Sequence, residues 1–137
     1  MGETEGHHAL VGRTYGYLLT RYPPEVGHAI FVDLPSTPKG EKPRRIFGFV
    51  PDVLAMDVPA TFHASGEAKT AGDLENDHTR AQLRAYLRHL RLRGGVLVVT
   101  VPWTVAATAR GMVAAAVVDT GATMVEIVIL DDGVPWP

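Results

Sequence analysis

The segment 51–69, PDVLAMDVPATFHASGEAK, has the pattern of two strands joined by a turn at residues 58–60. Asp52 lies in the first strand-like run, and Glu67 and Lys69 lie at the end of the second. Side chains in a strand alternate between the two faces of a sheet, so Glu67 and Lys69 share one face. Three charged side chains that converge on a sheet are costly unless they bind something. The segment therefore predicts a hairpin within a sheet and a charged site upon it.

The two faces of the second run, residues 61–69, differ in polarity. The face of Glu67 and Lys69 also carries three polar side chains: Thr61, His63 and Ser65. The opposite face carries side chains that are small or apolar enough to pack on helices: Phe62, Ala64, Gly66 and Ala68. The carboxylates of Asp52 and Glu67 are hard oxygen ligands that suit a divalent cation such as Mg²⁺. Lys69 supplies a positive point charge beside them.

The same residues resemble the motifs of the PD-(D/E)xK nuclease superfamily, which includes restriction endonucleases, Holliday-junction resolvases and RecB-type exonucleases. The two half-motifs are Val50-Pro51-Asp52-Val53 and Gly66-Glu67-Ala68-Lys69-Thr70. A third element, Gln82-Leu83-Arg84-Ala85-Tyr86, resembles the Q-x-x-x-Y helix of the RecB-type and Cas4-like branch. Thr70 directly after the lysine also fits that branch, whereas Glu67 stands where the branch commonly has Asp. The resemblance covers residues 4–130.

The resemblance implies metal-dependent hydrolysis of phosphodiester bonds in DNA. Asp52, Glu67 and the backbone carbonyl of Ala68 would coordinate Mg²⁺ or Mn²⁺. Lys69 would hold the attacking water or stabilise the charge that develops on the phosphorane. The product would carry a 5′-phosphate, as is usual in this superfamily.

Two positions near the N-terminus stay open under the same resemblance. A Glu from the first helix often completes the metal environment in this fold, and we favour Glu5 over Glu3 for that role. The RecB-type branch also often has an upstream histidine. His7 and His8 both remain candidates, because no spacing rule separates them.

Residues 77–93 predict a helix with three stripes, ended by Gly94-Gly95. Leucines recur on a face that we expect to be buried: Leu83, Leu87 and Leu90. Arginines recur at intervals of four, four and three on another face: Arg80, Arg84, Arg88 and Arg91. A polar and aromatic stripe lies between them: Gln82, Tyr86 and His89. The resemblance places Gln82 and Tyr86 at the rim of the site, where they orient the water, the lysine or a DNA phosphate.

The overall charge is distributed unevenly along the chain. The formal net charge is −2, yet ten of the thirteen basic residues are arginines. The distribution of charge matters more for partner binding than the sum. We therefore expect Arg80, Arg84 and Arg88, with Thr70, to contact DNA, and a solvated arginine face is the alternative.

The composition fits a single domain over residues 1–137. The hydrophobic content of 46% is sufficient for a core, and the absence of cysteine excludes disulfides and thiolate metal sites. No apolar run reaches the ~18 residues of a membrane span, and the first ten residues lack a signal-peptide core. We therefore expect a soluble, cytoplasmic protein without a membrane partner. A small chain without a specificity domain fits either a structure-selective homodimer or a subunit of a larger DNA-processing assembly.

The hydrophobic patterns predict an α/β fold. Helices are expected over residues 7–22, 77–93 and 104–118, and strands over residues 28–34, 45–57, 61–69, 96–101 and 124–130. The resemblance implies a restriction endonuclease-like core, αβββαβ, with an additional helix and strand and a mixed central sheet flanked by helices.

The same residues also allow functions other than that of a nuclease. The chain would be a catalytically silent nucleic-acid-binding or regulatory module if it kept the fold and lost turnover. It would be a structural α/β domain if Asp52, Glu67 and Lys69 only form an ion-pair network. Structural zinc is disfavoured because no histidine pair has the i, i+4 helical spacing. The acidic run at residues 73–77 fits helix capping better than a Ca²⁺ loop.

Overall fold

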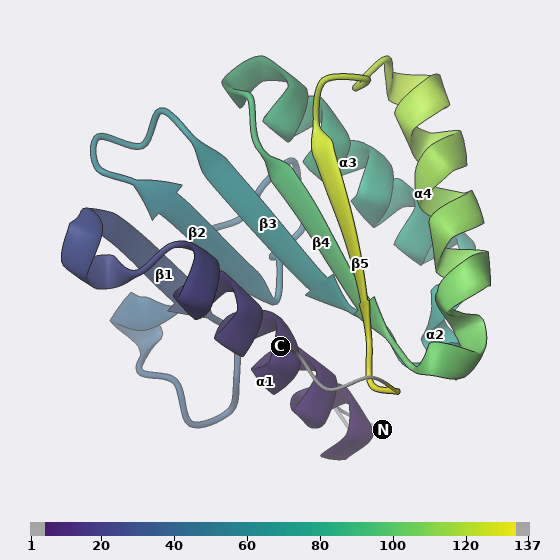
Figure 1. Ribbon diagram of the computed structural model, residues 1–137, viewed down its shortest axis with the longest axis horizontal. Coiled ribbons are helices and arrows are strands. Elements are labelled where there is room, and N and C mark those ends of the chain that lie inside the picture. The colour runs from purple at the N-terminus through teal and green to yellow at the C-terminus, as the bar shows by residue number, and fades with distance from the viewer. Residues whose placement is uncertain (1–4, 134–137) are drawn as a thin grey trace.

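Residues 5–133, which a computed structural model describes, contain one five-stranded mixed sheet with the strand order β1-β2-β3-β4-β5 (Figure 1). The strands are β1 His28–Val32, β2 Val53–Asp57, β3 His63–Ala68, β4 Val96–Val101 and β5 Glu126–Asp131. The pairs β1–β2 and β2–β3 are antiparallel, and the pairs β3–β4 and β4–β5 are parallel. The expected α/β class and mixed sheet are thus confirmed.

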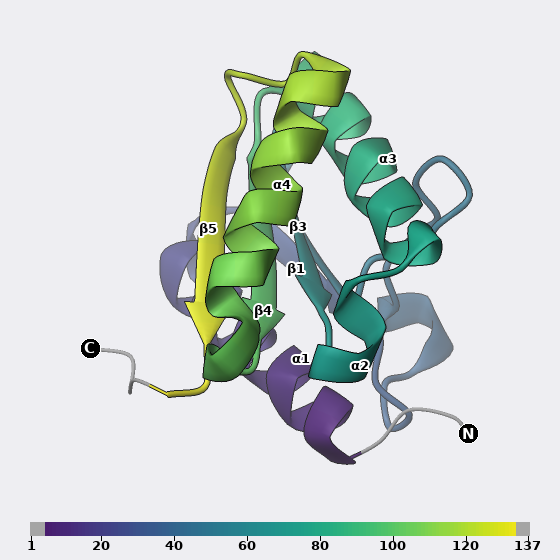
Figure 2. The ribbon, with the colours of Figure 1, turned by 90° about the vertical axis from the view of Figure 1, so that its right-hand side faces the viewer.

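Helices cover both faces of this sheet (Figure 2). The α-helices are α1 Glu5–Arg21, α2 Ala71–Leu74, α3 Asp77–Arg93 and α4 Ala106–Thr120, and the short 3₁₀ segments are η1 Pro24–Val26, η2 Lys39–Glu41 and η3 Trp103–Val105. Helix α1 lies on one face, and α3 and α4 lie on the other (Figure 2). Parallel strands need crossover connections, and α3 and α4 supply them.

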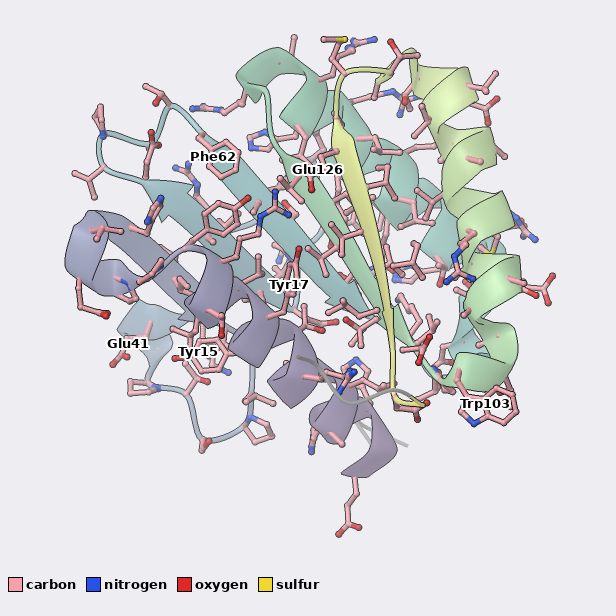
Figure 3. All side chains as sticks on the ribbon, viewed as in Figure 1. Tyr15, Tyr17, Glu41, Phe62, Trp103 and Glu126 are labelled. Carbon is pink, nitrogen blue, oxygen red and sulfur yellow. The ribbon has the colours of Figure 1, made fainter. Side chains whose placement is uncertain are left out.

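The sheet therefore has two cores, one on each side. Leu97 and Val99 of β4 pack with α3 and α4, whereas Val96 and Val98 pack with α1. This alternation explains why β4 is apolar at nearly every position, as expected for a strand that is buried on both faces. An ion pair closes the α1 side, where Arg21 Nη2 donates to Glu126 Oε1 at 2.6 Å, close to Tyr17 (Figure 3).

Several predicted elements have the bounds that the sequence indicated, and one does not. Helix α3 and strand β4 match the predicted ranges 77–93 and 96–101. The predicted strand 45–57 is wrong over its first half, because β2 begins only at Val53. A tight turn at Phe47-Gly48, where both residues have positive φ, interrupts the extended chain. The remaining predicted bounds differ from the structure by at most two residues. No helix within residues 5–133 is long and apolar enough to cross a membrane.

The backbone of β3 approaches α1 closely at Gly66. A Cβ atom there would lie 2.5 Å from Thr14 Cγ2. Thr14 cannot easily rotate away, because its hydroxyl donates to the carbonyl of Leu10 and is also hydrogen-bonded to the hydroxyl of Thr100. By contrast, a Cβ at Gly12 of α1 would meet nothing within 4 Å. Close packing is therefore required next to Glu67 and not within the helix itself.

We expect Gly66→Ala to lower the free energy of unfolding by about 1–3 kcal/mol, the usual cost of overpacking. The control substitution Gly12→Ala should instead raise it by up to about 1 kcal/mol, because alanine is the better helix former. Urea denaturation of the two variants measures both effects. Equal stability of the two variants would show that α1 moves freely relative to β3.

Candidate active site

The register of the β2–β3 hairpin places Asp52 opposite Glu67. Val53 pairs with Gly66, so the residues that flank this pair on the open side are Asp52 and Glu67. Directly opposed residues of antiparallel strands project their side chains from the same face. The chain between them turns at residues 58–60, where Ala60 N donates to Asp57 O at 2.7 Å. The predicted turn therefore brings the two carboxylates together.

A polar cavity of about 250 Å³ opens at this end of the sheet. Its polar walls come from His7, Asp33, Asp52, Glu67, Lys69, Asp73 and Gln82. All three charged residues that the sequence singled out thus line one cavity. The catalytic tyrosine candidate, Tyr86, contacts it from behind through Glu67.

Asp52 is held in place by backbone and by α1. The residue is buried, and its Oδ2 accepts a hydrogen bond from Ala68 N at 2.8 Å. His7 Nε2 lies 3.5 Å from the same oxygen and donates to Ala68 O at 3.1 Å. Of the two candidate histidines, His7 is the one that lines the cavity, because α1 begins directly above the end of β3.

Glu67 carries the strongest electrostatic perturbation of this site. It is only 3% exposed, and Tyr86 Oη donates to its Oε1 at 3.2 Å. Burial raises the pKa of Glu67 well above its usual value, and the charge of Asp52 raises it further, while Lys69 lowers it. Burial, and then the charge of Glu67, also raise the pKa of Tyr86, so its phenol stays a neutral donor.

Lys69 follows β3 and reaches back to Glu67. Its Nζ lies 3.5 Å from Glu67 Oε2, and its backbone N donates to Thr100 O at 3.0 Å. The side chain is 11% exposed. Strand alternation therefore places Lys69 on the face of Glu67, as predicted, with its ammonium at the cavity.

Gln82 contributes an oxygen without a partner to the same cavity. Its Oε1 is buried and accepts no hydrogen bond from the residues that the structure describes. A buried acceptor without a donor is unusual, and a hydrogen-bond donor or a cation would satisfy it. It lies on the same wall as two carboxylates and the carbonyl of Ala68.

This donor set fits a hard divalent cation. Mg²⁺ and Mn²⁺ take oxygen ligands and often need only one or two protein carboxylates, with water and substrate as the rest. Asp52, Glu67 and the carbonyl of Ala68 provide such a set. Within residues 5–133, no three His, Asp or Glu side chains are grouped closely enough to hold a metal ion by themselves.

The structure does not bring every predicted site residue to the cavity. Glu5 is exposed in the first turn of α1 and does not line it, while Glu3 lies outside the described residues. Thr70 precedes α2, and its hydroxyl donates to Asp73 Oδ2 at 3.1 Å, which places it close to the rim. The role of Glu5 as a metal ligand would need the first turn of α1 to rearrange.

The arginine stripe of α3 lies on a different side of the helix from the cavity. Arg80 and Arg84 border a separate cavity of about 350 Å³ between α3 and α4. Arg80 Nη1 pairs with Asp77 Oδ1 at 3.3 Å, and Arg88 is exposed. Gln82 and Tyr86 face β3 instead. Helical periodicity identified the stripe correctly, but the stripe does not surround the carboxylates.

Two acidic residues of the cavity had no role in the sequence-based prediction. Asp33 lies opposite Asp52, since Asp33 N donates to Asp52 O at 2.8 Å, and its Oδ1 pairs with Lys42 Nζ at 3.3 Å. Asp73 was interpreted only as a helix cap. An Asp that directly follows a strand is the signal that could have indicated Asp33, once the β1–β2 register was known.

No family model, no curated protein and no solved structure matches this chain.

Proposed function

We propose that the protein is a metal-dependent nuclease that hydrolyses phosphodiester bonds of DNA, with Mg²⁺ or Mn²⁺ as cofactor. The observation that carries the proposal is the opposed pair of buried carboxylates, Asp52 and Glu67, beside Lys69 in one polar cavity. Two carboxylates that face each other in a buried site repel, and a bound divalent cation relieves that repulsion.

The arrangement of the elements supports the same proposal. Helix α1, the antiparallel strands β1 to β3, helix α3 and the parallel strand β4 follow the order αβββαβ. This is the core that membership of the PD-(D/E)xK superfamily implies, with α4 and β5 as the additional helix and strand. Asp52 precedes the second strand and Lys69 follows the third, as the two half-motifs of that superfamily require.

Besides the metal ligands, four residues at or behind the cavity have a task in this reaction. Asp52, Glu67 and the carbonyl of Ala68 would hold Mg²⁺ or Mn²⁺, which would polarise the phosphate and lower the pKa of a coordinated water. The ammonium of Lys69 stabilises the negative charge that grows on the phosphoryl oxygens in the transition state. Tyr86 fixes the orientation of Glu67 through its hydrogen bond to Oε1, and His7 fixes the carbonyl of Ala68. Gln82 orients the attacking water or a phosphate oxygen through its side-chain amide.

The reaction breaks the bond between phosphorus and the 3′ oxygen of the preceding sugar. Water supplies the new oxygen on phosphorus, and the leaving oxygen takes up a proton, which gives a 3′-hydroxyl and a 5′-phosphate. DNA is the proposed partner, and the protein acts as a homodimer or as a subunit of a larger DNA-processing assembly.

A cleavage assay tests the proposal directly. Purified protein is incubated with labelled linear, circular and branched DNA in Mg²⁺, in Mn²⁺ and in EDTA. We expect cleavage that requires the cation and yields 5′-phosphorylated ends. Cleavage in EDTA, or no cleavage of any substrate with either cation, would contradict the proposal.

One hydrogen bond and one ion pair favour a second candidate function, a nucleic-acid-binding module without turnover. Asp52 already accepts from Ala68 N, and Lys69 already pairs with Glu67, as in a structural ion-pair network. Such a protein would bind DNA without cleaving it. Stabilisation by Mg²⁺ in a thermal melt separates a metal site from a purely structural network, and cleavage then separates the enzyme from the silent module.

The arginine stripe gives a separate prediction about DNA binding. If Arg84 and Arg88 neutralise phosphates, the double variant Arg84→Ala/Arg88→Ala should reduce the slope of log K against log salt by about 0.9 per lost contact on duplex DNA. The effect should be the same for all sequences, because phosphate contacts carry no sequence information. Arg110→Ala, an exposed arginine of α4, is the control and should leave the slope unchanged. An unaltered slope and affinity in the double variant would assign the stripe to solvent or to a protein partner.

A further inference from the structure

The loop between η2 and β2 contains a tight turn that presents an aromatic side chain. Ile46 and Phe49 form both backbone hydrogen bonds of a two-residue hairpin, with N···O distances of 2.6 and 3.0 Å. Phe47 and Gly48 at its tip have φ values of 47° and 88°. Positive φ at both central positions is the type I′ turn, which favours Asn-Gly or Gly-Gly. Phenylalanine is therefore strained at a position that Asn would occupy easily, and such strain is concentrated at functional sites.

The two phenylalanines of this hairpin have different environments. Phe49 packs against Tyr86 and His78 of α3, with ring centroids 6.4 and 5.5 Å apart, and anchors the loop. Phe47 remains 60% exposed, and its ring forms a T-shaped pair with His89 at a centroid distance of 6.1 Å. The structure thus keeps one face of an aromatic ring available at the surface beside α3.

The surroundings of Phe47 are positively charged. Arg44 and Arg45 are exposed, Arg45 Nη1 donates to Gly48 O at 2.9 Å, and Arg93 Nη1 donates to Ala60 O at 2.7 Å. Within the part of the chain that the structure describes, none of these three arginines forms an ion pair with a carboxylate.

Two histidines, His63 and His89, lie beneath this surface and contact its residues. His63 is buried, accepts from Arg44 Nη2 at 3.3 Å and donates from Nδ1 to His89 Nε2 at 2.8 Å. Burial and the nearby positive charges lower the pKa of His63 to about 4, and they lower that of His89 as well. Both rings are therefore neutral near pH 7, and the charge of the surface comes from arginine alone.

We propose that Phe47, with Arg44 and Arg45, forms a stacking site for an unpaired base of the nucleic acid, so that the preferred substrate is single-stranded DNA or DNA with a frayed or branched end. A flat aromatic ring beside arginines that have no carboxylate partner fits a ligand that combines flat bases with phosphates. Proteins bind single strands in this way, by stacking bases on aromatics while cations follow the backbone. A base inside a duplex does not expose its face, so a duplex cannot use the ring.

The position of the hairpin connects this site to the proposed active site. The chain runs from the turn through Val50, which lines the active-site cavity, to Asp52. On α3, His89 beside Phe47 is one turn beyond Tyr86, which bonds Glu67. A strand that stacks one base on Phe47 would lie on the α3 side of the sheet, the side from which Tyr86 reaches Glu67. The inference rests on the proposed function for the identity of the partner, but it concerns binding and not turnover.

The test compares Phe47→Asn with the wild type by fluorescence anisotropy, using labelled oligothymidylate and a blunt DNA duplex in EDTA, where no metal-dependent cleavage competes. Phe47→Asn creates the favoured Asn-Gly turn, so its melting temperature should equal or exceed that of the wild type. We expect its affinity for oligothymidylate to fall about 5- to 160-fold, the usual range for one lost stacking contact, and its affinity for duplex to stay unchanged. Phe47→Trp should bind single-stranded DNA as the wild type does, because it keeps an aromatic ring, and the fluorescence of the tryptophan should be quenched on stacking. Val118→Ala, which removes an exposed apolar side chain of α4, is the control.

The phosphate contribution is tested in the same assay. Arg44→Ala should reduce the slope of log K against log salt by about 0.7 on single-stranded DNA. Equal losses on single strand and duplex, or wild-type affinity of Phe47→Asn for oligothymidylate, would overturn the stacking site while leaving the nuclease proposal intact. Selective loss of single-strand binding in a protein that shows no metal-dependent cleavage would keep the stacking site and remove the nuclease. Failure of the wild type to bind either DNA would overturn the stacking site and leave the loop as a contact for a protein partner.

Discussion

Lys69→Ala is expected to fold like the wild type and to cleave DNA at least about 10²–10³-fold more slowly at saturating Mg²⁺, the usual effect of losing one donor to a developing negative charge. The fold should survive because the ammonium lies at the cavity and not in either hydrophobic core. Its loss also removes a charge that lowers the pKa of Glu67, so protons should compete more strongly with the metal for this carboxylate. Single-turnover rates over a range of Mg²⁺ concentrations separate the two effects.

Two further lysine substitutions serve as comparisons in this experiment. Lys42→Ala is the matched control, because Lys42 pairs with Asp33 of the same cavity without contacting Asp52 or Glu67, and its cleavage rate should stay near that of the wild type. Lys69→Arg keeps the charge but replaces a point charge with a larger planar group, so we expect only partial activity. Cleavage by the purified Lys69→Ala protein at the rate of the wild type would mean that another residue performs this task, or that a contaminant cleaves.

The sequence predicted the centre of this site because period-two alternation and a short turn are local features. Glu67 and Lys69 fall on the expected polar face, and Ala64 and Ala68 fall on the expected apolar face that packs with α1. Asp52 meets Glu67 because the turn at residues 58–60 fixes the register of the hairpin. Such contacts follow from a few neighbouring residues, so a single sequence is enough to anticipate them.

Contacts between distant elements could not be predicted in the same way. Periodicity aligned Arg80, Arg84 and Arg88 on α3, but it cannot say which neighbour a stripe faces, and here α4 and solvent take that place. Asp33 joins the cavity only through the register of β1 on β2. The turn at Phe47 escaped prediction because it replaces the residues that normally mark a type I′ turn with a strained aromatic.

Glu67→Gln is expected to abolish cleavage and, in the absence of metal, to make the protein more stable at neutral pH. The carboxylate is buried beside Asp52, and its pKa in the folded state lies well above that in the unfolded chain. The folded wild type therefore binds this proton more tightly than the unfolded chain does. Its stability is greatest below the unfolded pKa and falls as the pH rises through the folded pKa.

Glutamine resembles the protonated carboxyl and keeps an oxygen that can accept from Tyr86, so the variant should lose this pH-dependent penalty. We expect a metal-free gain of roughly 1–3 kcal/mol at neutral pH, the usual cost of a poorly compensated buried polar group. Mg²⁺ should stabilise the wild type by binding its folded state only, and it should no longer stabilise the variant.

Glu126→Gln is the matched control with the opposite sign. Arg21 lowers the pKa of Glu126, so its contribution is present above the unfolded pKa and is lost on acidification. Thermal melts from acidic to neutral pH, with and without Mg²⁺, measure the pH dependence and the Mg²⁺ effect for both variants and the wild type. A Glu67→Gln protein that is less stable than the wild type without metal, or that Mg²⁺ still stabilises fully, would show that Asp52 and Glu67 form a structural network and not a cation site.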